Sequence, residues 1–145
     1  MRNVSQIIGR KGSRVVSVTR EAPVLEAIRV MAEHHIGAVL VMRGDELVGI
    51  ASERDYARKI MLMSRASKET PVRDIMTPDV MYVRPDHTSE ECMALMTENR
   101  LRHLPVMDGG QLLGLVSIGD LVKDIISQQQ FIIQQLEHYI TGERG

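Results

Sequence analysis

Apolar and polar positions along this chain follow a pattern that repeats after 65 residues. When residues 15–60 are laid over residues 80–125, 13 of the 46 aligned pairs are identical. Ordinary composition would produce about three identities in such a window. Of the remaining 33 pairs, 11 exchange one hydrophobic residue for another. The pattern therefore indicates an internal duplication, which predicts two copies of one structural unit.

The same five elements are predicted in each copy, in the order β-α-β-β-α. A short β-rich run comes first, and apolar residues at helical spacing follow it. A glycine-containing turn then separates two strands, which is typical of a hairpin. We expect the strands at 15–18, 36–42 and 46–51 in the first copy and at 80–83, 104–107 and 111–116 in the second, with second helices starting at Ser52 and Ser117.

These copies define the expected domain organisation, which is 1–65 for the first unit, 66–127 for the second and 128–145 for a C-terminal helix and tail. Residues 64–70 are polar and are interpreted as the linker. A unit of about 50 residues buries too little apolar surface to be stable alone, so the two should pack as a pseudo-two-fold pair. Beyond them, apolar residues continue over 125–140, with a polar interruption expected at 127–130. This extra apolar surface favours a partner subunit.

The segment 7–13 contains Gly9-Arg10-Lys11-Gly12, which matches the Gly-x-x-Gly loop of a KH RNA-binding domain. That loop needs a preceding strand and a helix on each side, and only eight residues precede Gly9. We therefore interpret the segment as a basic lead-in loop to the first unit.

Composition narrows the function classes. The chain has 145 residues, a formal charge of 18 − 19 = −1 and 43% hydrophobic residues, which argues against a dedicated nucleic-acid binder. Neither a signal peptide nor an apolar run of about 18–20 residues that could span a membrane is evident. The single cysteine favours a reducing, cytoplasmic location. The sequence shows no metal-ligand spacing and no nucleophile motif, so neither a metal site nor an enzyme is expected.

One seven-residue pattern occurs twice, at 49–55 and at 114–120, where a strand gives way to a helix. It reads Gly, two apolar or small residues, Ser, two variable residues and Asp. One interpretation is a capping box that merely starts a helix. The other is an anion site, because a helix N-terminus offers N–H groups and a positive dipole end. In that case Asp55 and Asp120 could accept hydrogen bonds from a ribose diol.

The duplicated unit with this ending resembles a tandem pair of CBS (cystathionine-β-synthase) domains, known as a Bateman module. The resemblance covers residues 5–127 and implies an α/β fold of two β-α-β-β-α units about a pseudo-two-fold axis, followed by a C-terminal helix. It also implies a regulatory module that binds AMP, ADP, ATP, S-adenosylmethionine or NAD in the clefts between its domains and commonly forms homodimers.

The resemblance also implies the binding residues. The serine and aspartate of each motif would contact phosphate and ribose, and the residue after the motif glycine would line the adenine pocket. Each cleft also borrows residues from the opposite copy. One site would comprise Ile50, Ser52, Arg54 and Asp55 with Met76, Thr77, Met81, Leu101, Arg102 and His103; the other would comprise Leu115, Ser117 and Asp120 with Lys11, Val16, Ile36, Gly37 and Ala38.

The two expected sites differ in charge. Gly37-Ala38 in the first copy becomes Arg102-His103 in the second, and Arg54 has Gly119 as its counterpart. Since arginine can grip phosphate in a bidentate way, we expect the Asp55 site to hold the more phosphorylated end of a nucleotide. The alternative is that these are ordinary surface charges. At the level of the whole protein, the alternative to a nucleotide-sensing regulator is an assembly module with vestigial clefts.

Overall fold

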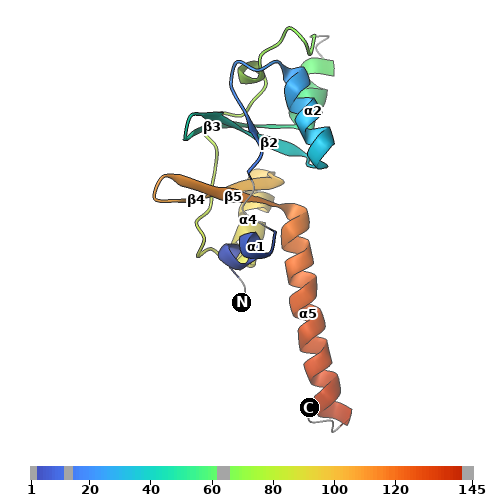
Figure 1. Cartoon of the computed structure of the whole chain (residues 1–145). Coiled ribbons are helices and arrows are strands. Elements are labelled where there is room, and N and C mark those ends of the chain that lie inside the picture. The colour runs from blue at the N-terminus through green and yellow to red at the C-terminus, as the bar shows by residue number, and fades with distance from the viewer. Residues whose placement is uncertain (1–2, 12–14, 62–65, 142–145) are drawn as a thin grey trace.

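The computed structural model describes residues 3–11, 15–61 and 66–141. In the first unit, three strands form a sheet in the order β1-β2-β3, with β1 parallel to β2 and β2 antiparallel to β3. The helices α2 and α3 and a π-helical turn, η1, complete the unit (Figure 1). The bounds are β1 Ser17–Val18, α2 Val24–His34, β2 Ala38–Arg43, β3 Glu46–Ser52, α3 Glu53–Tyr56 and η1 Ala57–Met61.

The second unit has the same hairpin, formed by β4 and β5, which pair antiparallel. Its first expected strand, over 80–83, is reduced to a single parallel bridge between Val83 and Val106. The prediction of a strand there was therefore too long, although Val83 is fully buried as the pattern required. The bounds are α4 Ser89–Asn99, β4 His103–Asp108, β5 Gln111–Ser117 and α5 Ile118–Thr141.

Fine details of the backbone also repeat. Each hairpin has a shift of register at the same place, between Val41 and Met42 in the first unit and between Val106 and Met107 in the second. The first helix of each unit ends on a residue in the left-handed conformation, His35 with φ 53° and its counterpart Arg100 with φ 54°. The duplication and the fold predicted from it are confirmed.

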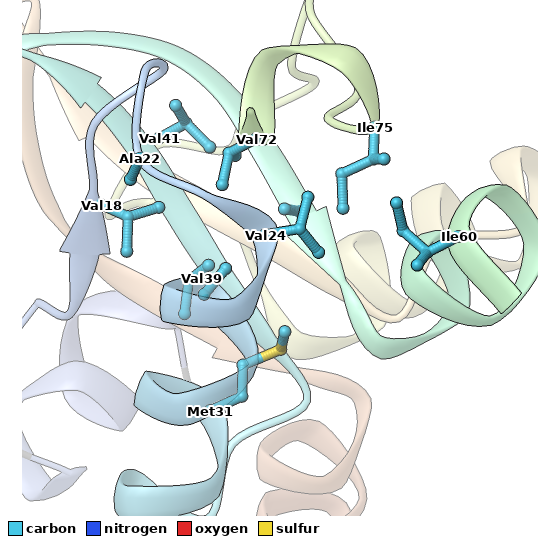
Figure 2. Packing of buried hydrophobic residues seen from close by; sticks show 11 residues of the cluster. Val18, Ala22, Val24, Met31, Val39, Val41, Ile60, Val72 and Ile75 are labelled. Carbon is cyan, nitrogen blue, oxygen red and sulfur yellow. The ribbon is translucent and has the colours of Figure 1, made fainter. Parts of the chain in front are cut away.

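Two hydrophobic cores hold the molecule together, one in each unit. The packing of the first is shown in Figure 2, where Val39 of β2 lies near Met31 of α2, and Val41 of the same strand belongs to the same cluster. Equivalent positions of the repeat occupy the second core, where Leu104 stands for Val39 and Met96 for Met31. Each core is therefore built from the same positions of the repeat.

The residues that precede each unit pack against the other unit. Helix α1 (Val4–Lys11) places Val4 and Ile7 in the second core, so the prediction of a lead-in loop to the first unit was wrong. Reciprocally, the short 3-10 helix η2 (Val72–Asp74) and the residue after it place Val72 and Ile75 in the first core. This exchange ties the two units into one structure.

The predicted linker, as far as it is described, also packs on the first unit. The Val24 backbone N–H donates to the Thr70 carbonyl at 2.8 Å, and the Leu25 N–H donates to the Ser67 carbonyl at 3.0 Å. The first turn of α2 has no side-chain cap, because Pro23 occupies the N-cap position. Residues 66–70 therefore satisfy backbone donors of α2 that would otherwise lack partners. Residues 64–65 lie outside the described part of the chain.

Helix α5 runs without a break through the polar residues 127–130, so the second helix of the second unit and the predicted C-terminal helix are one helix. The three glutamines at 128–130 are good helix formers, which explains why a polar stretch did not end the helix. Beyond Gln130 the helix projects away from the two units (Figure 1). Its apolar residues there are exposed, as shown by Phe131 at 62% and Tyr139 at 85%. Among the described helices, none is both long and apolar enough to cross a membrane.

Candidate functional site

A cavity of about 390 Å³ lies where the first unit faces the start of β4 in the second. This volume is in the range of small-molecule sites, which are about 300–1,000 Å³. The second unit contributes the end of α4 and the start of β4, while the first contributes β3 and α3. The lining residues are Gly37, Ile50, Ser52, Glu53, Arg54, Asp55, Arg58, Thr77, Arg100, Leu101, Arg102 and His103.

Most residues expected at the Asp55 site line this one cavity, and they come from both units as the repeat predicts. The two exceptions are methionines. Met76 packs against the first core, and Met81 is 39% exposed and is not part of the lining. The cavity is therefore lined by Ile50, Ser52, Arg54, Asp55, Thr77, Leu101, Arg102 and His103 from the predicted set.

Ser52 and Asp55 form a complete capping box at the start of α3. The Asp55 N–H donates to the Ser52 Oγ at 3.2 Å, and the Ser52 N–H donates to the Asp55 Oδ2 at 3.0 Å. The same box occurs in the second unit, where the Ser117 N–H donates to the Asp120 Oδ2 at 2.8 Å. The capping interpretation of the repeated motif is thus correct for its local structure.

Backbone donors at these helix starts are already engaged. The Glu53 N–H donates to the Gly37 carbonyl at 3.1 Å, and its counterpart Ile118 N–H donates to the Arg102 carbonyl at 2.9 Å. The expectation that the helix start would present free N–H groups to an anion was therefore wrong for these donors. Helix α3 itself spans only four residues before the π-helical turn η1 begins.

Four arginines surround the cavity, against two carboxylates, those of Glu53 and Asp55. Arg54 and Arg58 come from the α3–η1 segment, and Arg100 and Arg102 flank the approach to β4. Sequence reasoning missed Arg58 and Arg100. Arg58 lies four residues after Arg54 and so shares its helix face, a signal present in the sequence.

Arg100 was hidden because its position depends on the left-handed end of α4. A residue in that conformation changes the direction of the chain, and the residue type at position 100 does not predict this conformation.

The residues expected at the second site belong to several elements of the described structure. Gly37 lines the cavity described above, where a Cβ at Gly37 would lie 3.6 Å from the His103 ring. Ala38 is fully buried opposite Ser52 in the β2–β3 ladder. Val16 and Ile36 pack against the first core. Leu115 lies opposite Pro105 in the β4–β5 ladder. Lys11 is the last residue of α1, and its side chain is outside the described part of the structure.

The glycines of the repeated motif, Gly49 and Gly114, leave room for the segment that precedes each unit to pack against the other unit. A Cβ at Gly49 would lie 2.5 Å from the Met76 sulfur and 3.1 Å from the Thr77 carbonyl oxygen. At the equivalent Gly114 it would lie 3.2 Å from the end of the Ile8 side chain. Thr77 also pairs with Ile50 through two backbone hydrogen bonds of 2.8 and 3.0 Å. The glycine of each motif thus lets the segment preceding one unit lie against a strand of the other.

The remaining titratable groups lie outside this cavity. Burial raises the pKa of the Cys92 thiol to about 11, so this cysteine is a small core residue that resists ionisation. It occupies the position of Ala27 in the repeat, and both are fully buried. Within the described ranges, no three His, Cys, Asp or Glu side chains cluster in a way that could hold a metal ion.

Comparison with protein families supplies the decisive observation. The model of the CBS domain matches the chain twice, over residues 4–62 and 72–127. The chain belongs to the CBS domain family. The CBS domain-containing protein CBSX3, mitochondrial, of Arabidopsis thaliana is 40% identical over 129 residues, which are 86% of this chain and 63% of that protein. The chain thus spans less than two thirds of this relative.

Solved structures agree with this CBS domain assignment. A CBS-domain protein from Burkholderia ambifaria MC40-6 is 54% identical, with a TM-score of 0.85 over 88% of this chain and 96% of that one. The CBS domain protein PAE2072 from Pyrobaculum aerophilum, a complex with AMP, is 21% identical, with a TM-score of 0.73 over 81% of this chain and 88% of that one. The latter shows the shared fold.

Proposed function

We propose that this CBS domain pair is a regulatory module that binds an adenine nucleotide (AMP, ADP, ATP or NAD) in the cavity between its units. The observation that carries the proposal is the cavity's lining. It joins Ser52 and Asp55 of the first unit to Arg102 and His103 of the second. Such a site offers hydroxyl and carboxylate groups for a ribose and guanidinium groups for phosphate. The AMP complex of a protein with the same fold supports this ligand class.

The arrangement suggests how binding would be transmitted. Because the cavity walls belong to different units, a ligand that touches both would stabilise one relative orientation of the units. It would shift the conformation only to the extent that it prefers that orientation. A protein partner, whose identity the chain does not encode, would then read the change. We propose no catalytic step, and we place the module in the cytoplasm on the grounds of its single, buried cysteine.

The first test identifies the ligand. Small molecules released by denaturing freshly purified protein would be analysed by mass spectrometry, and thermal unfolding would be followed with AMP, ADP, ATP and NAD. A ligand at 100 times its Kd adds about 2.7 kcal/mol of stability, which is an easily measured shift. An adenine nucleotide that is released or stabilises the fold would support the proposal. No release and no shift with any of the four would refute it.

A second adenine site remains part of the proposal. It would use Asp120 and Ser117 with residues of the first unit that include Gly37 and Ala38. Calorimetric stoichiometry tests it directly. Two nucleotides bound per chain would support a second site, whereas one bound nucleotide whose affinity depends on Asp55 and not on Asp120 would rule it out.

We also propose that the protein is a homodimer and that α5 forms part of the interface. Along α5, residues 118, 122, 125, 129, 132, 136 and 139 alternate spacings of four and three. That is the a/d pattern of a coiled coil, in which a second copy presents the same self-complementary stripe. Gln129 is the one polar member, and the exposed members on the projecting half include Ile132, Leu136 and Tyr139.

Analytical ultracentrifugation would test the homodimer. Leu136→Gln lies within the stripe and should shift the protein toward monomer, whereas Gln134→Ala on the opposite face of α5 should not. Monomeric wild-type protein at micromolar concentration would refute the proposed homodimer. A dimer that Leu136→Gln leaves unchanged would place the interface elsewhere.

One observation favours an assembly module with vestigial clefts as the second candidate function. Ser52 and Asp55 satisfy each other in a capping box, so they have a structural reason to be present without a ligand. The two functions make different predictions, since the assembly module requires the dimer and no nucleotide. A homodimer that binds none of the four nucleotides would favour this alternative.

A further inference from the structure

We infer that the cavity selects nucleotides by the length of their phosphate chain and favours a triphosphate over a monophosphate. This inference deepens the proposed function and rests on it. It starts from the two arginines that the family resemblance did not single out, Arg58 and Arg100, which join Arg54 and Arg102 around one cavity.

The cavity lining sets the four guanidinium groups against two carboxylates, those of Glu53 and Asp55. In the described part of the chain, no ion pair or hydrogen bond engages the side chains of these four arginines. The Asp55 carboxylate is occupied by the capping box, and its nearest cation is Lys59, at 3.9 Å. Like charges gathered around one cavity repel each other unless an anion lies among them, even though Arg58, Arg100 and Arg102 are exposed and partly screened by solvent. The cavity is thus prepared for a ligand with more than one negative group.

A single phosphate would leave part of this charge unused. A phosphate monoester has three acceptor oxygens, and a guanidinium that binds in a bidentate way uses two of them. One phosphate can therefore satisfy about two of the four guanidinium groups in this geometry. A triphosphate supplies enough oxygens, and enough charge, for all four.

The arginines also come from different units. Arg54 and Arg58 lie on the α3–η1 segment of the first unit, four residues apart and so on one face. Arg100 and Arg102 lie between α4 and β4 of the second unit. A phosphate chain placed among them would connect the two units, whereas a monophosphate would be held with fewer contacts across the cavity. The length of the ligand's phosphate chain thereby becomes the property that the module senses.

The experiment is calorimetric titration of the full chain with AMP, ADP and ATP in magnesium-free buffer. We expect affinity to rise by about tenfold per added phosphate, equivalent to about 1.4 kcal/mol each. Arg58→Gln and Arg100→Gln keep the apolar stem and remove the charge, and each should lower the ratio of ATP to AMP affinity by about tenfold. Lys123→Gln is the matched control, because Lys123 is the exposed counterpart of Arg58 in the repeat and lies outside this cavity's lining.

The outcomes separate the inference from the proposed function. Equal affinities for AMP and ATP, or variants that keep the wild-type ratio, would overturn the inference while leaving nucleotide binding intact. No binding of any of the three nucleotides would instead reject the proposed function. Equal loss of the ratio in Lys123→Gln would show a general charge effect and would also overturn the inference. Circular dichroism of each variant checks that the exposed substitutions leave the fold unchanged.

Discussion

The two units of this protein share a backbone and differ in the chemistry attached to it. Their hairpins shift register at the same position, and their first helices end in the same left-handed conformation. Yet the small Gly37 corresponds to Arg102, and Arg54 corresponds to Gly119. The repeat thus preserves the positions that build the cores and the capping boxes of Ser52 and Ser117, while exposed positions beside the cavity have diverged. The positive charge of the described cavity accordingly comes from arginines of both copies, which stand at non-equivalent positions of the repeat.

The largest expected difference between the units concerns their motif aspartates. Asp55→Ala should weaken nucleotide binding by about a hundredfold, since two hydrogen bonds to a charged group are worth about 1.5–3 kcal/mol each. Asp120→Ala should weaken binding at the described cavity by less than about threefold, because Asp55 and not Asp120 lines that cavity, and any loss in this variant would concern the proposed second site. Calorimetric titration measures both.

The control for these variants is a third capping box. Asp55→Ala also removes a helix cap, at a cost of about 1 kcal/mol in stability. Glu91→Ala removes the equivalent carboxylate from the Thr88 capping box at the start of α4, outside the cavity lining. If Glu91→Ala weakened binding as much as Asp55→Ala, the effect would be one of stability rather than of ligand contact.

The next comparison is between two hydrogen-bonding side chains at equivalent positions of the repeat, Lys59 and Asp124. Asp124 is buried and accepts hydrogen bonds from the Ser89 Oγ at 2.7 Å and from Gln128 at 2.8 Å. Asp124→Ala would leave the buried Ser89 hydroxyl without this acceptor, so we expect a loss of about 1–3 kcal/mol. Lys59 donates to the Ile75 carbonyl at 3.0 Å from a partly exposed position. Lys59→Ala should cost under about 1 kcal/mol, because water can replace it. Equal losses in urea unfolding would contradict this ranking.

A third comparison uses the motif glycines. Gly49→Ala would press a Cβ against the Met76 sulfur and the Thr77 backbone, and overpacking of this kind costs about 1–3 kcal/mol. Gly114→Ala meets only the flexible end of Ile8 and should cost under about 1 kcal/mol. Thermal unfolding of both variants checks the order. A larger loss for Gly114→Ala would mean that α1 is held more rigidly than the segment at 76–77.

The smallest expected effect is the pH dependence of two identical residues, Glu26 and Glu91. Hydrogen bonds from the Thr88 backbone and side chain lower the pKa of Glu91 in the folded protein. Its contribution to stability is thus present above the pKa of the unfolded chain and is lost as pH falls through the lowered folded pKa. Glu91→Gln should therefore flatten the acid side of the stability curve.

Glu26→Gln provides the contrast, because the N-cap of α2 is Pro23, which makes no side-chain cap hydrogen bond. We expect the acid side of the curve to keep its wild-type slope in this variant. Urea unfolding between about pH 3 and 6 measures both. Identical curves for the two variants would show that the Thr88 cap does not distinguish these glutamates.

Much of this fold could be predicted from the sequence, because the duplication presents each local pattern twice. The 65-residue spacing predicted the hairpins, the helix starts at Ser52 and Ser117, and the positions that fill both cores. Each of these depends on local periodicity or capping chemistry, which neighbouring residues in the chain decide. The grouping of Asp55 with Arg102 was implied by the resemblance to CBS domain pairs, in which each cleft takes residues from both copies.

Only the tertiary structure decided what the segments before each unit do. Helix α1 packs on the second unit, and Val72 and Ile75 pack on the first. Any apolar side chain of suitable shape can fill a core position, whichever part of the chain it comes from. Residues 4–11 do have apolar residues at helical spacing, namely Val4, Ile7 and Ile8, but a local pattern of this kind does not tell which unit the helix packs against. The contribution of Arg100 likewise depends on the left-handed residue that ends α4. The sequence alone determined the repeated unit and its caps, and three-dimensional packing decided which segments complete each core and which charges face the cavity.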